Sequence, residues 1–299
     1  IKGSGTNGPG QYIYSSDVAV DSSGNVFVTY NEGSSSSALQ IYTAKLSGTD
    51  GSTLDFSAAG SGRYLNSSAY SSTSQYWHSQ VVDSSGNLYR RGKDNLASPV
   101  AFIEKYNNTG TRQWMRTQGY STSWLFTPIP TWLTIDSSNN LYQCGYRYED
   151  STNYNQQGCL FKYSDAGSLT WQAHRKSADS DNWESLRFRT CVVDSSGNVY
   201  VSDKGNHLIR RINYSGNVTT LAGLDGVSGS SDGNGTNARF NSPYGVAVDS
   251  LGNVYVTDKD NHLIRKIDAS GNVSTLAGQA GVSGFADGNG TNARFNSPY

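Results

Sequence analysis

The sequence predicts an all-β protein that is built from five repeated units. One stretch, CVVDSSGNVYVSDKGNHLIRRINYSGNVTTLAG, runs from Cys191 to Gly223 and returns as VAVDSLGNVYVTDKDNHLIRKIDASGNVSTLAG from Val246 to Gly278. Within it, apolar and polar residues alternate in short runs, which is typical of half-buried strands. Turn-forming residues such as DSSGN separate the runs. A near-copy at this spacing indicates a repeat architecture.

Weaker copies of the stretch begin at three earlier aspartates, Asp21, Asp83 and Asp136. Together with Asp194 and Asp249 these aspartates follow one another after 62, 53, 58 and 55 residues. We therefore expect one domain over residues 1–299 with five units in sequence. Their approximate bounds are 11–70, 71–126, 127–183, 184–240 and 241–299.

The composition is that of a turn-rich β protein with a neutral polar surface. Charged residues make up only 16% of the 299 residues, the net charge is −1, and 33 residues are glycine. This balance gives no overall basic field for nucleic acid or an anionic membrane. The sequence also contains no apolar run of the length that spans a bilayer, which takes about 18 residues or more. It begins at Ile1 without methionine, and we expect a mature or trimmed chain.

The first unit follows a glycine-rich lead-in over residues 1–14. Residues 16–30 (SDVAVDSSGNVFVTY) give two alternating runs joined by DSSGN, a hairpin loop in which Asp and Ser cap the turn and Gly24 or Asn25 takes positive φ. We expect a third strand over residues 38–46 and a weaker fourth over residues 53–58. The unit is therefore predicted to be a four-stranded antiparallel meander.

The second and third units repeat this plan and share a signature late in the unit. Lys105, Tyr106, Gly110 and Trp114 of the second unit recur as Lys162, Tyr163, Gly167 and Trp171 of the third, at a constant shift of 57 residues. A constant offset over four positions indicates a common strand arrangement. No helix of any length is predicted in the chain.

The fourth and fifth units are close copies and share a long tail. The tails read GVSGSSDGNGTNARFNSPY and GVSGFADGNGTNARFNSPY, and each must lead from the last strand of one sheet towards the first strand of the next. In them, an Arg–Phe pair (Arg239–Phe240 and Arg294–Phe295) is expected to dock the loop. Tyr299 aligns with Tyr244, so we expect either that the two ends of the chain meet or that a sixth or further unit follows Tyr299.

Two of the three cysteines are placed for a disulfide. Cys144 ends one predicted strand and Cys159 begins the next, and a hairpin would bring them opposite each other within bonding reach. The alternative is a pair of free thiols in a sheet, where cysteine behaves as a small hydrophobic residue. Cys191 stands where the next repeat has Val246 and is expected to be a buried core thiol.

Seven N-x-S/T sequons permit glycosylation without demonstrating it. They lie at Asn66, Asn107, Asn213, Asn217, Asn234, Asn272 and Asn289.

The last two units resemble the NHL repeat family, on the residues Asn206-His207-Leu208 and Asn261-His262-Leu263 and on the flanking pattern ARFNSPYGVAVD…DSxGNVYVxD…NHLIRxI. This match covers roughly residues 186–299. The first three units resemble, more loosely, a related bacterial repeat of the VDSSGNVYVTG type. Both resemblances imply a β-propeller, in which each unit is a blade that buries both faces against its neighbours. They also imply that His207 and His262 are structural residues that bond within the blade.

The residue types give no catalytic or metal-binding set, and we expect no cofactor and no enzyme activity. Four histidines cannot supply the three-histidine site of a propeller lyase with zinc, because only His78 lies near a predicted first strand and His174 lies on an outer one. The two DGNGTN segments lack the bidentate Glu and the ligand spacing of an EF-hand. No G-x-S-x-G, P-loop or Rossmann pattern occurs. The arginines of NHLIR are matched by aspartates in the same units, which indicates a solvated surface of mixed charge.

These observations predict a non-enzymatic interaction or structural module that is secreted or on a cell surface, with a protein partner or self-association into a fibre or array. The chain breaks between units and its ends resemble each other, and open head-to-tail contacts of this kind build filaments. The rival prediction is a lectin-like propeller that binds carbohydrate or another ligand through aromatic residues such as Tyr120, Trp124 and Tyr148. A metal-dependent lyase or hydrolase is the third alternative.

Overall fold

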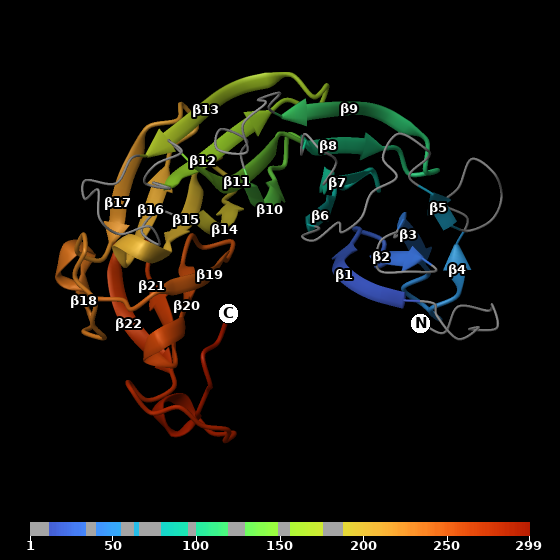
Figure 1. The fold of residues 1–299 in the computed structure, drawn as a ribbon. Coiled ribbons are helices and arrows are strands. Elements are labelled where there is room, and N and C mark those ends of the chain that lie inside the picture. The colour runs from blue at the N-terminus through green and yellow to red at the C-terminus, as the bar shows by residue number, and fades with distance from the viewer. Residues whose placement is uncertain are drawn as a thin grey trace. The chain divides into compact units, whose positions relative to one another are not determined.

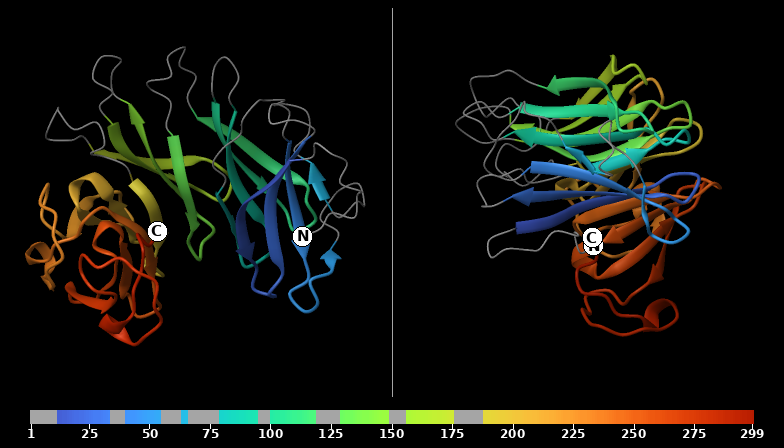
Figure 2. Two further views of the ribbon diagram at one scale, coloured as in Figure 1. Left: turned by 60° about the horizontal axis from the view of Figure 1, so that its bottom comes forward. Right: turned by 90° about the vertical axis from the view of Figure 1, so that its right-hand side faces the viewer.

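The structure is a computed structural model, and it shows five antiparallel sheets (Figures 1 and 2). The residues it describes are 12–33, 40–54, 63–65, 79–94, 100–118, 129–148, 156–175 and 188–299. The chain divides into two compact units, 1–127 and 128–299. We number the sheets as blades 1 to 5 in chain order. The predicted all-β class is confirmed, whereas the single domain over residues 1–299 stays a prediction.

The N-terminal unit contains blades 1 and 2. Blade 1 has the order β1-β2-β3-β4, with β5 also paired to β3, and blade 2 has the order β6-β7-β8-β9. The fourth strand expected over residues 53–58 begins at Thr53, and residues 55–58 lie outside the described part of the chain; a second short strand, β5, joins the same edge. The bounds are β1 Tyr12–Val20, β2 Val26–Gly33, β3 Gln40–Leu46, β4 Thr53–Leu54, β5 Arg63–Leu65, β6 Ser79–Val82, β7 Leu88–Asp94, β8 Val100–Tyr106 and β9 Arg112–Gln118.

The C-terminal unit contains blades 3, 4 and 5. Blades 3 and 4 have four strands each, and blade 5 has a fifth strand, β18, that comes from the preceding tail and pairs with β22. The bounds are β10 Ile129–Ile135, β11 Leu141–Tyr148, β12 Gln156–Tyr163, β13 Leu169–Arg175, β14 Phe188–Val193, β15 Val199–Asp203, β16 Leu208–Ile212, β17 Val218–Ala222, β18 Gly233–Asn234, β19 Pro243–Val248, β20 Val254–Asp258, β21 Leu263–Ile267 and β22 Asn272–Ala277.

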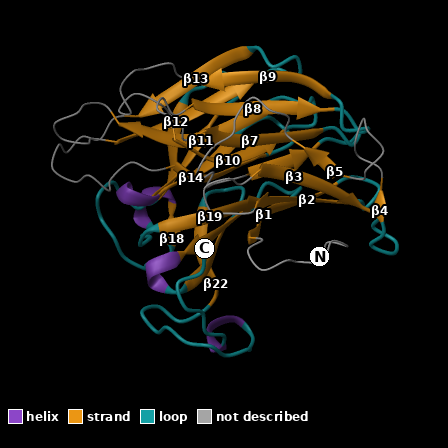
Figure 3. Cartoon of the chain, turned by 45° about the vertical axis from the view of Figure 1, so that its right-hand side comes forward, coloured by secondary structure: helices purple, strands orange, loops and turns teal. Residues whose placement is uncertain are grey.

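Helical structure in the described residues is limited to four single 3₁₀ turns, which are purple in Figure 3. Their bounds are η1 Lys204–Asn206, η2 Gly235–Asn237, η3 Lys259–Asn261 and η4 Gly290–Asn292. Within the described part of the chain, no helix is long and apolar enough to cross a membrane.

The DSSGN loop is a turn organised by its aspartate. In blade 4, one carboxylate oxygen of Asp194 accepts hydrogen bonds from the backbone N–H groups of Ser196 (2.9 Å) and Asn198 (2.8 Å). The other oxygen accepts from the Asn198 side-chain amide (2.8 Å) and the Tyr200 hydroxyl (3.0 Å). Gly197 takes φ +78°, a conformation that glycine adopts without steric cost. The sequence Asp-x3-Asn-x-Tyr therefore encodes both the turn and its attachment to the second strand.

The same arrangement recurs in the other blades. The hydroxyls of Tyr89, Tyr142 and Tyr255 donate to the aspartates six residues before them, at 3.0–3.1 Å. Burial, together with the charge of Asp194, raises the pKa of Tyr200 to about 12, so the hydroxyl stays a neutral donor. Blade 1 has Phe27 at this position, and there Lys45 lies 3.7 Å from Asp21 instead.

The Lys and Trp of the Lys-Tyr…Gly…Trp signature in blades 2 and 3 stack on a tyrosine of the second strand, so that the contact spans three strands. The Lys105 ammonium lies 5.0 Å from the ring centre of Tyr89, and Trp114 meets the same ring edge-on at 6.2 Å. Lys162 and Trp171 repeat these contacts on the corresponding tyrosine of blade 3, at 5.1 and 6.1 Å. Cation–π and edge-to-face aromatic contacts each add to the apolar burial.

Apolar side chains between adjacent sheets form the core of the C-terminal unit. One cluster lies between blades 4 and 5 and another between blades 3 and 4, and full burial of each large apolar side chain is worth about 1.5–3 kcal/mol. The first cluster includes Tyr200, Ile209, Phe240, Val254, Val256 and Ile267, and the second includes Tyr142, Leu160, Phe188, Cys191, Val199 and Ile212.

The predicted Cys144–Cys159 disulfide is not formed. Both thiols are buried and are not bonded to each other, because the strand register pairs Cys144 with Leu160 and Cys159 with Gly145. Residues directly opposite share a face and neighbours along a strand alternate, so the two sulfurs lie on opposite faces of the sheet. Cys191 is a buried core thiol, as predicted.

We expect Tyr200→Phe to lower the free energy of unfolding by about 1 kcal/mol, because it removes one hydrogen bond to Asp194 and leaves the ring packing intact. Urea unfolding followed by tyrosine and tryptophan fluorescence measures this change. Tyr214→Phe is the matched control, since that side chain is 68% exposed. Equal stability of the two variants would contradict the structural role of the hydroxyl.

Candidate functional site

The tails that follow blades 4 and 5 have nearly the same sequence but lie in different surroundings. We call residues 223–242 the internal linker, because it leads from blade 4 to blade 5. Residues 278–297, which follow blade 5, are the terminal linker. Each begins at a glycine of φ near +98°, which packs against the carbonyl of the NHL histidine.

The two NHL histidines hold these linkers to their blades. His207 and His262 both adopt the left-handed conformation directly after a 3₁₀ turn. The Nδ1 atom of His207 accepts a hydrogen bond from the backbone N–H of Ser242 (3.1 Å), and that of His262 accepts from Ser297 (3.0 Å). The predicted structural role is therefore correct, but the bond runs to the end of the linker and not within the blade. Burial lowers the pKa of His207, which favours the neutral ring that can accept this bond.

The internal linker folds back on itself and then joins blade 5. Its own bonds include Gly229 N–H to the Phe240 carbonyl (3.1 Å) and Arg239 N–H to the Ser231 carbonyl (3.0 Å). Strand β18 then pairs with β22, the outermost long strand of blade 5. The linker thus covers the edge of the blade that follows it.

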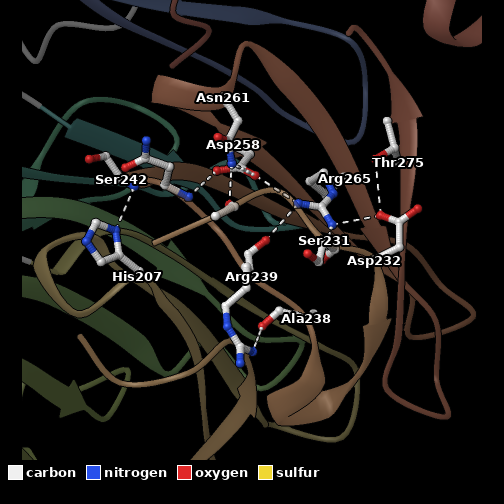
Figure 4. A network of polar contacts seen from close by, with 12 residues as sticks. His207, Ser231, Asp232, Ala238, Arg239, Ser242, Asp258, Asn261, Arg265 and Thr275 are labelled. Carbon is white, nitrogen blue, oxygen red and sulfur yellow. Dashed lines mark hydrogen bonds and ion pairs between the residues drawn. The ribbon is translucent and has the colours of Figure 1, made fainter. Parts of the chain in front are cut away.

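Arg265 of blade 5 is buried under this linker (Figure 4). Its guanidinium pairs with Asp258 at 2.9 Å and donates to the carbonyls of Arg239 (2.9 Å) and Ser231 (3.0 Å). It also contacts Asp232 at 2.8 Å and lies 5.1 Å from the ring centre of Phe240. Four of these five partners belong to the linker, so one arginine joins the linker to the blade.

Asp258 completes the cluster. One oxygen accepts from the backbone N–H of Asn241 (2.7 Å) and the other from the Asn261 amide (2.7 Å), which also donates to the Gly229 carbonyl (2.6 Å). Burial raises the pKa of Asp258, while these donors and Arg265 favour its charged form. A buried ion pair is favourable only where further hydrogen bonds satisfy its partners, and here the linker supplies several of them, to Asp258 from Asn241 and to Arg265 from Ser231 and Arg239.

The expectation that the NHLIR arginines form a solvated surface is wrong for Arg265 and Arg210. Both are buried, as are their partners Asp258 and Asp203. The signal was present in the sequence, since Arg265 lies midway between Leu263 and Ile267 on the face of β21 that alternation assigns to the core. Because arginine is charged, the sequence alone leads one to expect an exposed side chain even at this position of the strand.

Blade 4 has the same three residue types in a different setting. Arg210 pairs with Asp203 at 3.2 Å, and the Asn206 amide lies 3.0 Å from both oxygens of that aspartate. The guanidinium then reaches Thr220 at 2.5 Å. The sequence before blade 4, residues 171–187, contains no copy of the linker motif.

The terminal linker repeats the internal fold. Gly284 N–H bonds to the Phe295 carbonyl (3.0 Å) and Arg294 N–H to the Ala286 carbonyl (2.9 Å), as in the internal copy. Its surface is different: Phe285 is fully exposed (102%) and Tyr299, which follows the linker, is 83% exposed. The same local fold is therefore present with an open face.

The predicted glycosylation sites fall into three groups. Asn66 lies outside the described residues. Asn107 and Asn213 are half-buried and cap turns with their carbonyl oxygens. Asn217, Asn234, Asn272 and Asn289 are exposed, although the Asn234 amide donates to Asn272 (2.9 Å). Glycosylation stays a prediction.

Among the residues that the structure describes, no three His, Cys, Asp or Glu side chains gather in a way that could hold a metal ion. His78, Tyr120 and Trp124 lie outside the described residues, and so do the side chains of Tyr148 and His174. The DGNGTN segments form the 3₁₀ turns of the two linkers.

Three consecutive antiparallel blades of four or five strands, with a linker from blade 4 paired to the edge of blade 5, are the arrangement of a β-propeller in the described residues of the C-terminal unit. Residues 240–267 match the NHL repeat. The chain therefore carries an NHL repeat at these residues, within a fold of the β-propeller type.

Relatives known by sequence cover part of the chain. NHL repeat-containing protein 2 of Gallus gallus is 39% identical over 95 residues, which is 31% of this chain and 13% of that protein. NHL repeat-containing protein 3 of Homo sapiens is 26% identical over 144 residues, 45% of this chain and 40% of that protein. The chain thus spans less than half the length of these curated relatives.

Solved structures share the fold at low identity. A protein of unknown function from Bacteroides thetaiotaomicron matches 99% of this chain and 65% of its own, with a TM-score of 0.53 and 18% identity. An auxiliary nutrient binding protein from Bacteroides ovatus matches 90% of this chain and 60% of its own (TM-score 0.51, 15% identity). A streptogramin B lyase matches 89% of this chain and 72% of its own (TM-score 0.50, 12% identity).

We expect Arg265→Met to lower the free energy of unfolding by about 3–5 kcal/mol, because it leaves the buried Asp258 carboxylate without its charged partner. Chemical unfolding of the wild type and the variant measures the loss. The double variant Asp258→Leu/Arg265→Met is the control and should recover part of it. A cost below about 1 kcal/mol for Arg265→Met would show that the ion pair does not hold the linker.

We expect stability to fall as the pH drops below about 6.5, the ordinary pKa of histidine. The folded state holds His207 neutral because its pKa is lowered, so the unfolded chain binds a proton first and acid favours unfolding. The stabilisation from neutral His207 is fully present above pH 6.5. It decreases as the pH falls from 6.5 towards the lowered pKa that His207 has in the folded state.

The measurement is the thermal midpoint of the wild type and of His207→Asn between about pH 7 and 5. Asparagine tolerates the left-handed conformation and does not titrate. The raised pKa of Asp258 acts in the opposite direction but is common to both proteins, so their difference isolates the histidine. Parallel curves would contradict the assignment.

Proposed function

We propose that this protein is a non-enzymatic interaction module that works outside the cell or on its surface. Its interacting face is the part of the terminal linker around Phe285, and copies of the chain associate through this face. The low charge content, the polar Ser- and Asn-rich surface and the exposed sequons support an extracellular location.

The observation that carries this proposal is the contrast between the two linkers. Phe285, which stands where the internal linker has Ser230, projects fully into solvent. Exposed aromatic side chains beside polar groups that a fixed local fold holds in position are typical of protein interaction surfaces.

The repeated polar residues support a structural role over a catalytic one. The turn aspartates are saturated by their own loops, the NHL histidines are bound to linkers, and the buried arginines are paired with aspartates. Similarity to a lyase and to a nutrient binding protein, at identities of 15% and below, concerns the fold alone. The ligand-binding alternative depends on Tyr120, Trp124 and Tyr148, whose side chains lie outside the described part of the structure.

We expect the purified 299-residue protein to associate as its concentration rises, and Phe285→Ser to weaken this association. Burial of a phenylalanine side chain is worth about 1.5–3 kcal/mol, or roughly a tenfold to hundredfold change in the dissociation constant. Sedimentation velocity over a wide concentration range measures it. Leu251→Ser is a control, since that side chain is also exposed (78%) but lies on a hairpin loop of blade 5. A monomer at every concentration would contradict self-association.

A further inference from the structure

We propose that blades 4 and 5 form a binding site for a small carboxylate ligand where their first strands begin, with the guanidinium of Arg189 as its anchor. The ligand class is a monocarboxylate, because the anchor is a single guanidinium. The site shares no residue with the interacting face around Phe285, so it is independent of the proposed function.

Arg189 lies at the junction of the two blades. It stands near the start of β14, the first strand of blade 4, and its guanidinium carbon is 5.5 Å from the ring centre of Tyr244. Tyr244 lies on β19, the first strand of blade 5. The two residues occupy the same place in their repeats, five residues before Asp194 and Asp249. The cation of one blade is therefore held on the aromatic face of its counterpart in the next.

Hydroxyl groups hold the backbone around Tyr244 in place. The Thr190 hydroxyl donates to the Tyr244 carbonyl at 2.8 Å and accepts from the backbone N–H of Val246 at 3.1 Å. Gly245 donates its N–H to the Thr257 hydroxyl at 2.7 Å. These bonds tie β19 to β14 and to the second strand of its own blade. The ring beneath the guanidinium is thus fixed in advance, and a preformed site spends little free energy on ordering when a ligand binds.

The charge of Arg189 has no carboxylate partner in the described part of the chain. Its Nε atom is buried and makes no hydrogen bond. Arg210 and Arg265, the two fully buried arginines among the described residues of the C-terminal unit, pair with Asp203 and Asp258. A buried donor without a partner calls for an explanation such as a bound ion. Arg189 therefore has the charge and the donors to bind an anion that the chain itself does not supply.

The aspartates at the other end of the two strands are too far away and already bonded. Asp194 and Asp249 follow Arg189 and Tyr244 by five residues, which is about 16 Å along an extended strand. Each binds the backbone and the asparagine of its own turn. Neither aspartate can neutralise the guanidinium, so the anion must come from a ligand.

A guanidinium selects a carboxylate by shape as well as by charge. Its planar fork donates two parallel N–H bonds, which match the two oxygens of a carboxylate. Contact with the Tyr244 ring limits the orientations of the guanidinium, so the fork is partly organised before binding. A spherical anion such as chloride gains nothing from the fork. Carboxylate is therefore the ligand chemistry that this site favours.

The direct test follows the Nε–H resonance of Arg189 by nuclear magnetic resonance in the ¹⁵N-labelled 299-residue protein. The resonance is assigned through the backbone signals of the same residue. Sodium acetate is the probe, and sodium chloride at the same ionic strength is the control. We expect a shift that saturates with acetate and is absent with chloride. No shift in acetate, or an equal shift in chloride, would overturn the proposal.

Two variants test the fork itself through the midpoint of thermal unfolding. We expect the wild type to melt at a higher temperature in acetate than in chloride, because a ligand that binds only the folded state stabilises it. Arg189→Lys keeps the charge and removes the fork, and this difference should fall by at least half. Arg211→Lys changes an exposed arginine of the same blade and should leave the difference unchanged.

Acetate also acts on protein stability in a general way, but that effect is common to all three proteins. An equal difference between acetate and chloride in the wild type and both variants would overturn recognition through Arg189. The titration of the wild type does not require either variant to fold.

Discussion

The buried pairing of Arg265 with Asp258 is the interaction on which the junction between blades 4 and 5 depends. Each blade ends in an edge whose polar groups need partners, because unpaired buried charges and backbone groups cost several kcal/mol. The chain meets this requirement by sending the linker of one blade across the next. The carbonyls of Ser231 and Arg239 lie where the guanidinium donates, and the linker's aromatic residue closes the space beside it. Blade 5 is therefore completed by residues that precede it in sequence.

Within each blade, local hydrogen bonds of the first hairpin loop fix the strand pairing, and these bonds recur from blade to blade. An aspartate binds the backbone of its own loop and the side chain of the asparagine four residues on, and in four blades it accepts from a tyrosine on the second strand. Local hydrogen bonding of this kind fixes the register without help from other blades. The linkers act between blades instead, since the polar groups of the internal linker that face blade 5 bond to side chains of that blade. Stability inside a blade and recognition between blades are thus encoded in separate parts of the repeat.

Much of the fold could be predicted from the sequence, because period-two alternation and DSSGN loops are local signals. The late Lys-Tyr…Gly…Trp signature correctly marked a shared strand arrangement, which the stacking of Lys105 and Trp114 on Tyr89 explains. The disulfide was predicted wrongly, since a one-residue difference in register between Cys144 and Cys159 moves the sulfurs to opposite faces, and sequence does not fix that register. The burial of Arg265 cannot be predicted from charge balance along the chain, because four of its five partners lie in the internal linker, more than 20 residues earlier. The partner carbonyls of Arg265 are backbone atoms and have no sequence signature of their own.

The central claim is that a linker recognises the following blade through its arginine. A double-mutant cycle between Asp232→Asn and Arg265→Met, read out as free energy of unfolding, tests it most directly, because the cycle removes the cost that each substitution has by itself. We expect a coupling energy of at least about 0.5 kcal/mol between the linker carboxylate and the guanidinium of the blade, even though Asp232 is half exposed. Additivity of the two substitutions within about 0.3 kcal/mol would contradict it.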